Sequence, residues 1–314
     1  MIEDRSLDMA GTALEQPQQV AVTRPWATTV TRPRTRRITP GAVIRFSILT
    51  VASILWCAPI AWMLMTSLKP ESQIITYPPR WFPSDLSDLT LKNYDDVLNI
   101  PRGVDLVRAF RISLIIATIG TALTVVVDVL AGYVFARMRF PGRNILFAIV
   151  VASLIVPSEI LLIPNYITVW KFGWLNDYKA LIIPPIAGAF GVFLMRQFML
   201  GIPTDLEDAA RLDGAGRLQI LWTVILPLSR GPIAALAIFT YLGYWNEFTW
   251  PYIIINQADR MPLPIALIQF RGDYFSEYGQ LMAGATISAA PAVLVFLIAQ
   301  RSIIRSITLT GVKG

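Results

Sequence analysis

The chain has 314 residues, of which 54% are hydrophobic and only 15% are charged. This balance is more apolar than that of an average soluble domain and indicates a lipid environment for much of the chain. Histidine is absent and Cys57 is the single cysteine, which excludes a disulfide framework, a thiolate zinc site and histidine-based catalysis.

The N-terminus, residues 1–45, is predicted to be a disordered, basic arm on the cytoplasmic side. It contains six arginines and no acidic residue between Ala21 and Arg45. Because an apolar run follows directly, the positive-inside rule explains these charges better than nucleic-acid binding does. We therefore expect no nucleic-acid partner, and we expect residues 46–314 to form one transmembrane domain.

Six apolar runs then follow, each bounded by charged or turn-forming residues. A helix needs about 20 residues to cross a hydrocarbon core about 30 Å thick. The predicted spans are Phe46–Thr66, Ile112–Ala136, Ile145–Tyr166, Leu181–Met195, Pro232–Ile255 and Leu281–Gln300. In the last span, small residues at helical spacing (Gly284, Ser288 and Ala292) predict a seam where another helix packs closely.

The orientation follows from the charges of the short loops. Arg137, Arg139 and Arg143 crowd the turn after the second span, whereas the loop after the third carries only Lys171 and Lys179. Positive charge marks the cytoplasmic side, so both termini are predicted to lie in the cytoplasm. The loop 199–230 then lies in the cytoplasm, and the segment 67–111 lies outside.

The loop 199–230 contains signals for a short helix. Thr204 followed by Glu207 predicts a capping box, in which the two side chains satisfy each other's backbone amides. We expect a helix from Asp205 to Asp213, which Gly214 ends in the left-handed conformation. Acidic residues in its first turn suit the helix dipole.

A second amphipathic segment follows, with Leu218, Leu221 and Ile225 on one face and Pro227 at its predicted end. Short helices are marginal in water, so a capped one outside the bilayer favours docking to another protein. A helix lying on lipid headgroups is the alternative.

Ionisable residues inside spans are costly and are candidates for function. Glu247 lies in the fifth span beside Tyr244, Trp245 and Asn246, whose groups suit hydrogen bonding to and stacking on a polyol. For Glu247 itself we favour a gate or helix contact over solute specificity.

Glu159, followed by Asn165, lies near the outer end of the third span. It faces either a cavity or the interface. For Asp128 in the second span we favour a buried pairing with Arg137 over contact with solute. Trp250 is assigned to the aromatic belt at the membrane surface.

Several motifs resemble the importer-type ABC permeases. The stretch Asp208-Ala209-Ala210-x-x-Asp213-Gly214-Ala215, followed by Val224-Ile-Leu226-Pro227, resembles their signature loop. Five other motifs resemble the carbohydrate-uptake branch of this family: Thr66-Ser-Leu-Lys69, Asn93-Tyr94, Phe135-Ala-Arg-Met-Arg-Phe-Pro-Gly142, Trp245-Asn-Glu-Phe248 and Gly311-Val-Lys-Gly314. Asp208 departs from the family's glutamate, and Val224 replaces an isoleucine.

The resemblance implies an all-α integral membrane fold: a six-helix bundle with a cytoplasmic coupling helix between spans four and five. It implies a subunit of a multi-pass transporter in the bacterial cytoplasmic membrane, with a second permease, two ATPase subunits and an extracellular solute-binding protein as partners. The ATPase-coupling residues would be Thr204, Glu207, Asp208, Ala209, Ala210, Asp213, Gly214 and Ala215. Glu159, Asn165, Tyr244, Trp245, Asn246 and Glu247 are the candidate solute path.

No cofactor is expected on this chain, and the partner ATPase would use ATP and magnesium. The sequence has no G-x-x-x-x-G-K-[ST] phosphate loop, so we expect no ATPase activity of its own. The solute is expected to be a sugar or a sugar-like compound. A glycerol-3-phosphate or glycerophosphodiester importer, a secondary transporter or channel without an ATPase, and a membrane enzyme remain alternatives.

Overall fold

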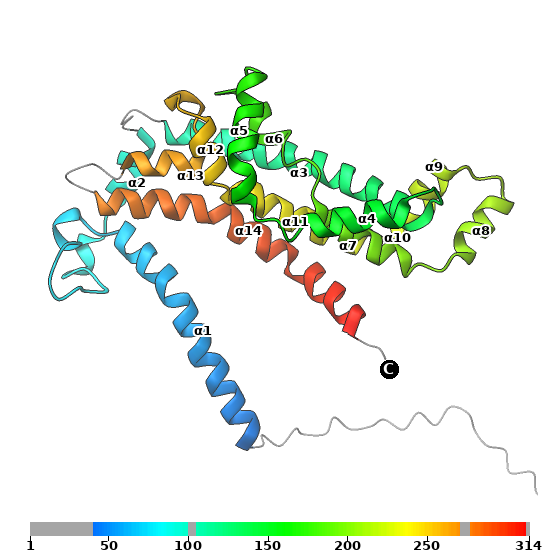
Figure 1. Cartoon of the computed structure of the whole chain (residues 1–314). Helices are drawn as coiled ribbons and strands as arrows, with labels where there is room; N and C mark the ends of the chain where they lie inside the picture. Colours follow the sequence, from blue (N-terminus) through cyan, green and yellow to red (C-terminus); the bar gives the residue numbers. More distant parts are fainter. Residues whose placement is uncertain (1–39, 100–104, 271–276, 312–314) are drawn as a thin grey trace, which may run out of the picture. The chain divides into compact units, whose positions relative to one another are not determined.

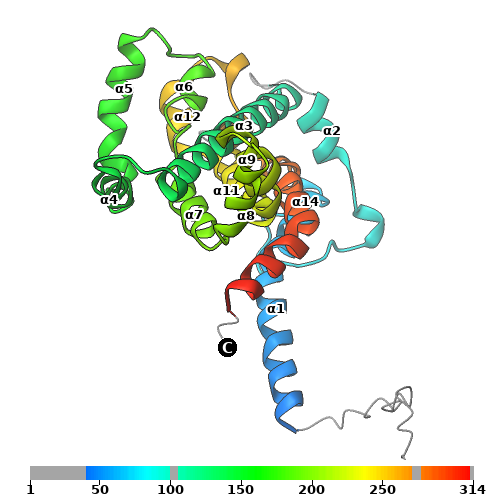
Figure 2. The same ribbon diagram turned by 90° about the vertical axis from the view of Figure 1, so that its right-hand side faces the viewer.

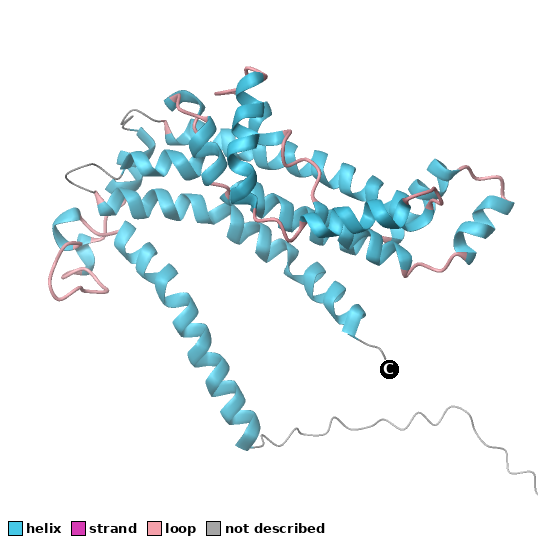
Figure 3. Ribbon diagram, viewed as in Figure 1, coloured by secondary structure: helices cyan, strands magenta, loops and turns pink. Residues whose placement is uncertain are grey.

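The computed structural model describes residues 40–99, 105–270 and 277–311. Over these residues the chain is helical, and Figure 3 shows no strand among them. The chain divides into two units, residues 1–53 and residues 54–314, and each is described by itself. The basic arm as far as residue 39 lies outside the described residues.

The first helix, α1 (Pro40–Ser67), begins six residues before the predicted boundary of the arm, so the prediction of disorder is wrong for residues 40–45. Proline suits the first turn of a helix because the backbone amides there have no partner within the helix, so the absent N–H costs no hydrogen bond. In the first unit, Val43, Phe46 and Leu49 are exposed, and the helix as a whole is long and apolar enough to cross a membrane.

The second unit is built around α3 (Leu106–Arg137), a continuous helix of 32 residues. It packs against α7 (Ala189–Leu200) and α11 (Arg230–Asn246), and α11 packs against α14 (Tyr278–Gly311). Figures 1 and 2 show α3, α7 and α11 side by side. The remaining α-helices are α2 (Lys92–Asn99), α4 (Arg143–Ser153), α5 (Leu162–Lys171), α6 (Lys179–Ile182), α8 (Asp205–Leu212), α9 (Arg217–Ile220), α10 (Leu226–Leu228), α12 (Thr249–Ile254) and α13 (Leu263–Ala266).

The predicted third span is not one straight helix. Its two halves, Arg143–Ser153 and Ser158–Lys171, meet at an angle of 96°. The break falls at Pro157, which has no amide hydrogen and disfavours a helical conformation at the residue before it. The predicted Ile145–Tyr166 span is therefore bent, and the pair is either a broken span or a re-entrant segment.

The fourth and fifth predicted spans are also divided. Leu181–Met195 is split between α6 and α7, and α7 has only 12 residues. The segment Pro232–Ile255 is split between α11 and α12. Within residues 40–99, 105–270 and 277–311, three helices are long and apolar enough to cross a membrane, or up to five if each bent pair is one span. These long apolar helices suit a membrane-spanning chain, whereas the count of six spans stays a prediction.

The predicted seam on α14 is present. A Cβ atom added to Gly284 would lie 2.6 Å from Leu267 Cδ2. One turn later, the carbonyl of Ser288 accepts a hydrogen bond of 3.0 Å from Trp245 Nε1 on α11. Small residues therefore let α14 approach its neighbours closely, as the spacing indicates.

The segment between α1 and α3 is tied to the helix ends around it. Asn93 Nδ2 donates to the carbonyls of Ser67 and Lys69. The two carboxylate oxygens of Glu71 accept the backbone amides of Tyr278 and Gly279, each at 2.9 Å. A carboxylate at a helix N-terminus satisfies unpaired amides and suits the dipole, so Glu71 fixes the start of α14.

Candidate functional site

The helix α8 forms where the sequence predicts it, but by other contacts. It spans Asp205–Leu212, and Gly214 follows in the left-handed conformation with φ of 84°. The capping box is wrong: the Thr204 side chain makes no capping hydrogen bond, and Glu207 turns to arginines instead of the cap amide. Helix termination at Gly214 is confirmed.

Glu207 is clamped between two arginines. Its Oε1 lies 2.8 Å from Nε of Arg137, and the exposed fractions of these side chains are only 3% and 8%. Arg137 also donates to the carbonyl of Ile202 at 2.5 Å. Arg211, whose side chain is 53% exposed, contacts Oε2 of Glu207 at 3.2 Å. Because Arg137 is the last residue of α3, this ion pair joins α8 to the end of the central helix.

The other predicted coupling residues are divided between two faces. Thr204, Asp208, Ala209, Asp213 and Gly214 are exposed, and Asp208 pairs with Arg211 of its own helix. Ala210 and Ala215 are half-buried and pack against the core at the ends of α3 and α7. Two leucines of α8 point outwards: Leu206 is 45% exposed and Leu212 is 91% exposed.

The second amphipathic segment continues past its predicted end. It consists of α9, a π-helical turn at Leu221–Ile225 and α10, so Pro227 lies inside it. Pro227 stands in the first turn of α10, the part of a helix where proline is tolerated. Leu221 and Ile225 are buried as predicted, whereas Leu218 is 71% exposed.

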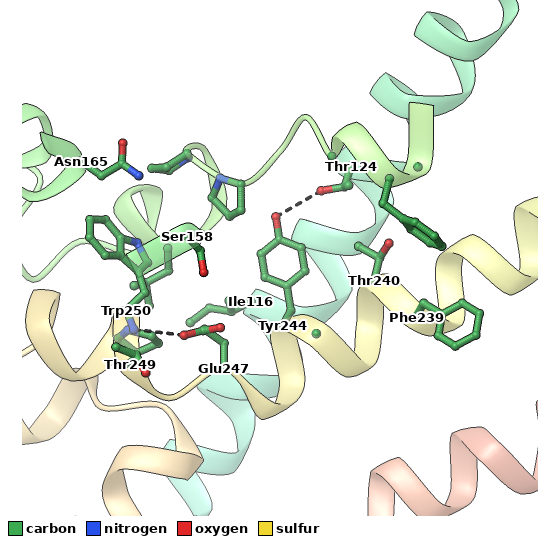
Figure 4. A pocket seen from close by; sticks show the side chains of 18 of the residues that line it. Ile116, Thr124, Ser158, Asn165, Phe239, Thr240, Tyr244, Glu247, Thr249 and Trp250 are labelled. Carbon is green, nitrogen blue, oxygen red and sulfur yellow. Dashed lines mark hydrogen bonds between the residues drawn. The ribbon is translucent and has the colours of Figure 1, made fainter. Parts of the chain in front are cut away.

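A cavity of about 590 Å³ lies between α3, the segment from Ser158 into α5, the α6–α7 segment and α11–α12 (Figure 4). Its walls carry both apolar and polar side chains. Hydroxyl groups come from Thr124, Ser158, Thr240 and Thr249, and aromatic rings come from Phe239, Tyr244 and Trp250. A cavity of this size, largely apolar with a few polar groups, is typical of a small-molecule site.

Four of the predicted path residues line this cavity: Glu159, Asn165, Tyr244 and Glu247. The Tyr244 hydroxyl lies 3.2 Å from Thr124 Oγ1 and donates to the carbonyl of Ile182 at 3.3 Å. Glu247 Oε1 accepts the amide of Trp250 at 3.1 Å, as Figure 4 shows. The contact ties Glu247 to the start of α12.

The other two path residues do not line it. Trp245 is 1% exposed and belongs to the core, where it stacks on Tyr241 and meets Phe110 edge-on. Asn246 is exposed outside the cavity lining, and its amide donates to the carbonyl of Leu242. Neighbouring residues on a helix point about 100° apart, so four consecutive residues cannot all face one cavity.

Two residues of the lining were assigned elsewhere from the sequence. Asp128 lines the cavity and accepts the amide of Gly188 at 2.9 Å, while Arg137 pairs with Glu207, so the predicted Asp128–Arg137 pairing is wrong. Trp250 lines the cavity and donates from Nε1 to the carbonyl of Ala180, so it is not only a belt residue. The deep position of Asp128 in an apolar run was the usable signal.

Apolar helices around a solute-sized cavity are the features of a multi-pass membrane permease. Residues 128–309 match the model of the binding-protein-dependent transport system inner membrane component family. The chain belongs to this family.

Individual relatives agree in length and sequence. The chain is 31% identical to the lactose transport system permease protein LacG of Rhizobium radiobacter, with 84% of this chain and 93% of the relative covered. It is 32% identical to the arabinooligosaccharides transport system permease protein AraQ of Bacillus subtilis, with 83% and 92% covered. The fold is similar to a chain in the crystal structure of a bacterial ABC transporter involved in the import of the acidic polysaccharide alginate. That likeness has a TM-score of 0.74 at 20% identity and covers 86% of this chain and 99% of the other.

Proposed function

We propose that the chain is the transmembrane permease subunit of an ATP-driven, binding-protein-dependent importer of sugars or sugar-like solutes. Membership of the transport family supports the permease role. The names of relatives for lactose, arabinooligosaccharide and diacetylchitobiose uptake support a carbohydrate solute.

The observation that carries the mechanism is the position of α3. Ile116, Thr124 and Asp128 of this helix line the cavity, and its last residue, Arg137, holds the coupling helix α8 through Glu207. A continuous helix transmits displacement because its backbone hydrogen bonds resist bending. Movement of α8 is thereby transmitted to the cavity wall, which is the coupling that alternating access requires.

The partner at α8 is proposed to be an ATPase subunit. The outward-pointing Leu206 and Leu212 expose apolar surface in a loop rich in charge, which favours a protein contact over a solvated loop. The full assembly would contain two ATPase subunits, a second permease subunit and an extracellular solute-binding protein. ATP and magnesium would act in the ATPase subunits, and this permease would bind no cofactor and catalyse no reaction itself.

The proposed orientation places both termini and α8 in the cytoplasm. The basic cluster of Arg137, Arg139 and Arg143 supports this orientation, since positive residues favour the cytoplasmic side. The ion pair between Arg137 and Glu207 further supports placing this cluster and α8 on the same side of the bilayer.

The proposal is tested by reconstituting the chain with its partners in proteoliposomes and measuring solute uptake. Uptake should require ATP on the α8 side and a loaded binding protein on the other side, and it should persist when ion gradients are collapsed with ionophores. Uptake that survives without ATP and stops on loss of an ion gradient would contradict the proposal and support a secondary transporter.

A further inference from the structure

The cavity has an unbalanced charge. Three carboxylates line it, those of Asp128, Glu159 and Glu247, and within the described part of the chain no lysine or arginine does. Two arginines that follow the lining residues on α3 and α7 have other partners: Arg137 pairs with Glu207, and Arg196 lies over the ring of Phe147. The potential inside the cavity is therefore negative.

Asp128 is the most costly of the three carboxylates. The residue is 1% exposed, and its Oδ1 accepts a single hydrogen bond, 2.9 Å from the amide of Gly188. Among the described residues, Oδ2 has no hydrogen-bond donor. Burying a carboxylate costs stability when no cation pairs with it and one oxygen accepts no hydrogen bond. The presence of such a group in a cavity wall therefore points to a ligand that completes its hydrogen bonds.

Two glycines make room for this carboxylate. A Cβ atom on Gly188 would lie 3.0 Å from Asp128 Oδ2, and a Cβ atom on Gly191 would overlap the same oxygen. Any larger residue at Gly191 would displace the carboxylate from its place in the wall. The backbone of the α6–α7 segment is thus shaped around Asp128.

The chemistry of these groups selects a class of solute. A carboxylate only accepts hydrogen bonds, so it matches the hydroxyl donors of a sugar. A phosphate or a carboxylate on the solute offers acceptors alone, and its negative charge would be repelled. The ring of Trp250 and the hydroxyls of Thr124 and Thr240 add surfaces that suit an uncharged, hydroxyl-rich solute.

We propose that this cavity takes uncharged polyhydroxy solutes and excludes anionic ones, with Asp128 Oδ2 accepting a solute hydroxyl. This inference rests on the proposed import function and narrows it, because it separates neutral sugars from glycerol phosphates. Similarity of fold to an importer of an acidic polysaccharide does not oppose it, because at 20% identity the likeness concerns the backbone.

The test measures the charge preference of the cavity directly. Cys57 is the only cysteine, so Cys57→Ala gives a background without thiols in this chain. In this background, Thr240→Cys places a single cysteine in the cavity. The matched control is Thr76→Cys, which places one at an exposed residue of the 67–105 segment. The purified transporter is treated with an uncharged hydroxyethyl methanethiosulfonate or with its anionic sulfonatoethyl analogue, and labelling of this chain is followed by mass.

The measured quantity is the labelling rate of the anionic reagent divided by that of the neutral reagent. This ratio should be about tenfold lower at position 240 than at position 76. Asp128→Asn, Glu159→Gln and Glu247→Gln together should bring the ratio at position 240 back to that of the control. If Asp128→Asn prevents folding, the double variant Glu159→Gln and Glu247→Gln is used instead, since both residues are exposed. It should still raise the labelling ratio at position 240 threefold or more.

Equal ratios at the two positions, or a ratio that the neutralised variants leave unchanged, would overturn the inference. The assay uses neither ATP nor transport. It therefore fails or succeeds independently of the proposed import function, which the proteoliposome experiment tests.

Discussion

Removing the positive charge of Arg137 should loosen α8. In Arg137→Met, the buried Glu207 loses its 2.8 Å partner and keeps only the contact of 3.2 Å to Arg211, whose side chain is 53% exposed. Breaking a buried ion pair from one side typically costs about 3–5 kcal/mol. Because Arg211 remains, we expect the lower end, about 3 kcal/mol.

Hydrogen–deuterium exchange of the full chain measures this loss. About 3 kcal/mol corresponds to an exchange rate up to about a hundredfold faster for amides that open with α8. One such amide is that of Asp213, which donates to the carbonyl of Ala209. Uptake should fall with it, since α8 would no longer move α3.

Two variants control for indirect effects. Arg211→Ala removes the contacts of a side chain that is 53% exposed to Glu207 and Asp208. Such contacts are worth at most about 1 kcal/mol, so exchange should rise no more than about fivefold. Arg137→Met combined with Glu207→Leu removes both charges and should restore much of the protection. Equal effects of Arg137→Met and Arg211→Ala, or no effect of either, would refute the clamp.

Gly191→Ala should lower thermal stability and uptake, because its Cβ would overlap Asp128 and lie 2.9 Å from Leu236 Cδ1, whereas Gly243→Ala, with open space beside it, should not; equal losses would contradict this. Trp245→Phe should cost about 2 kcal/mol of stability through loss of its 3.0 Å bond to Ser288, while solute affinity stays unchanged; a weaker affinity at full stability would return Trp245 to the path. The amide of Lys179 donates to Asp177 and, with the nearby Lys179 ammonium, holds the pKa of the Asp177 carboxyl below its usual range, so its stabilising effect is present above about pH 4 and is lost at lower pH. Wild type should therefore melt higher than Asp177→Asn at pH 7, and the difference should disappear at a pH low enough to protonate the folded-state carboxyl; a gap that persists there would contradict it.

Local signals in the sequence predicted much of the fold. The long apolar runs gave α1, α3 and α14 because a helix in lipid needs only length and apolarity. The acidic turn followed by Gly214 gave α8, since both the dipole preference and the left-handed glycine act within one turn.

The sequence could not show which partners meet in space. The local sequence around Glu207 suits a capping box. In the structure its carboxylate instead pairs with Arg137 at the end of α3, 70 positions earlier in the sequence. Four consecutive residues at 244–247 looked like one site, and the helical turn sends Trp245 into the core while Tyr244 lines the cavity. Trp250 lines the cavity because the helix is interrupted between α11 and α12, which changes the direction of the backbone before this residue.

The central claim, that α8 receives the movement of a separate ATPase, is tested most directly by site-specific photo-crosslinking in the assembled transporter. A photoreactive residue at Leu212, which is 91% exposed on α8, is compared with one at Leu91, which is 69% exposed in the segment before α2. An adduct with the ATPase is expected from Leu212 and none from Leu91. An ATPase adduct from Leu91, or none from Leu212 in a transporter that still imports solute, would contradict it.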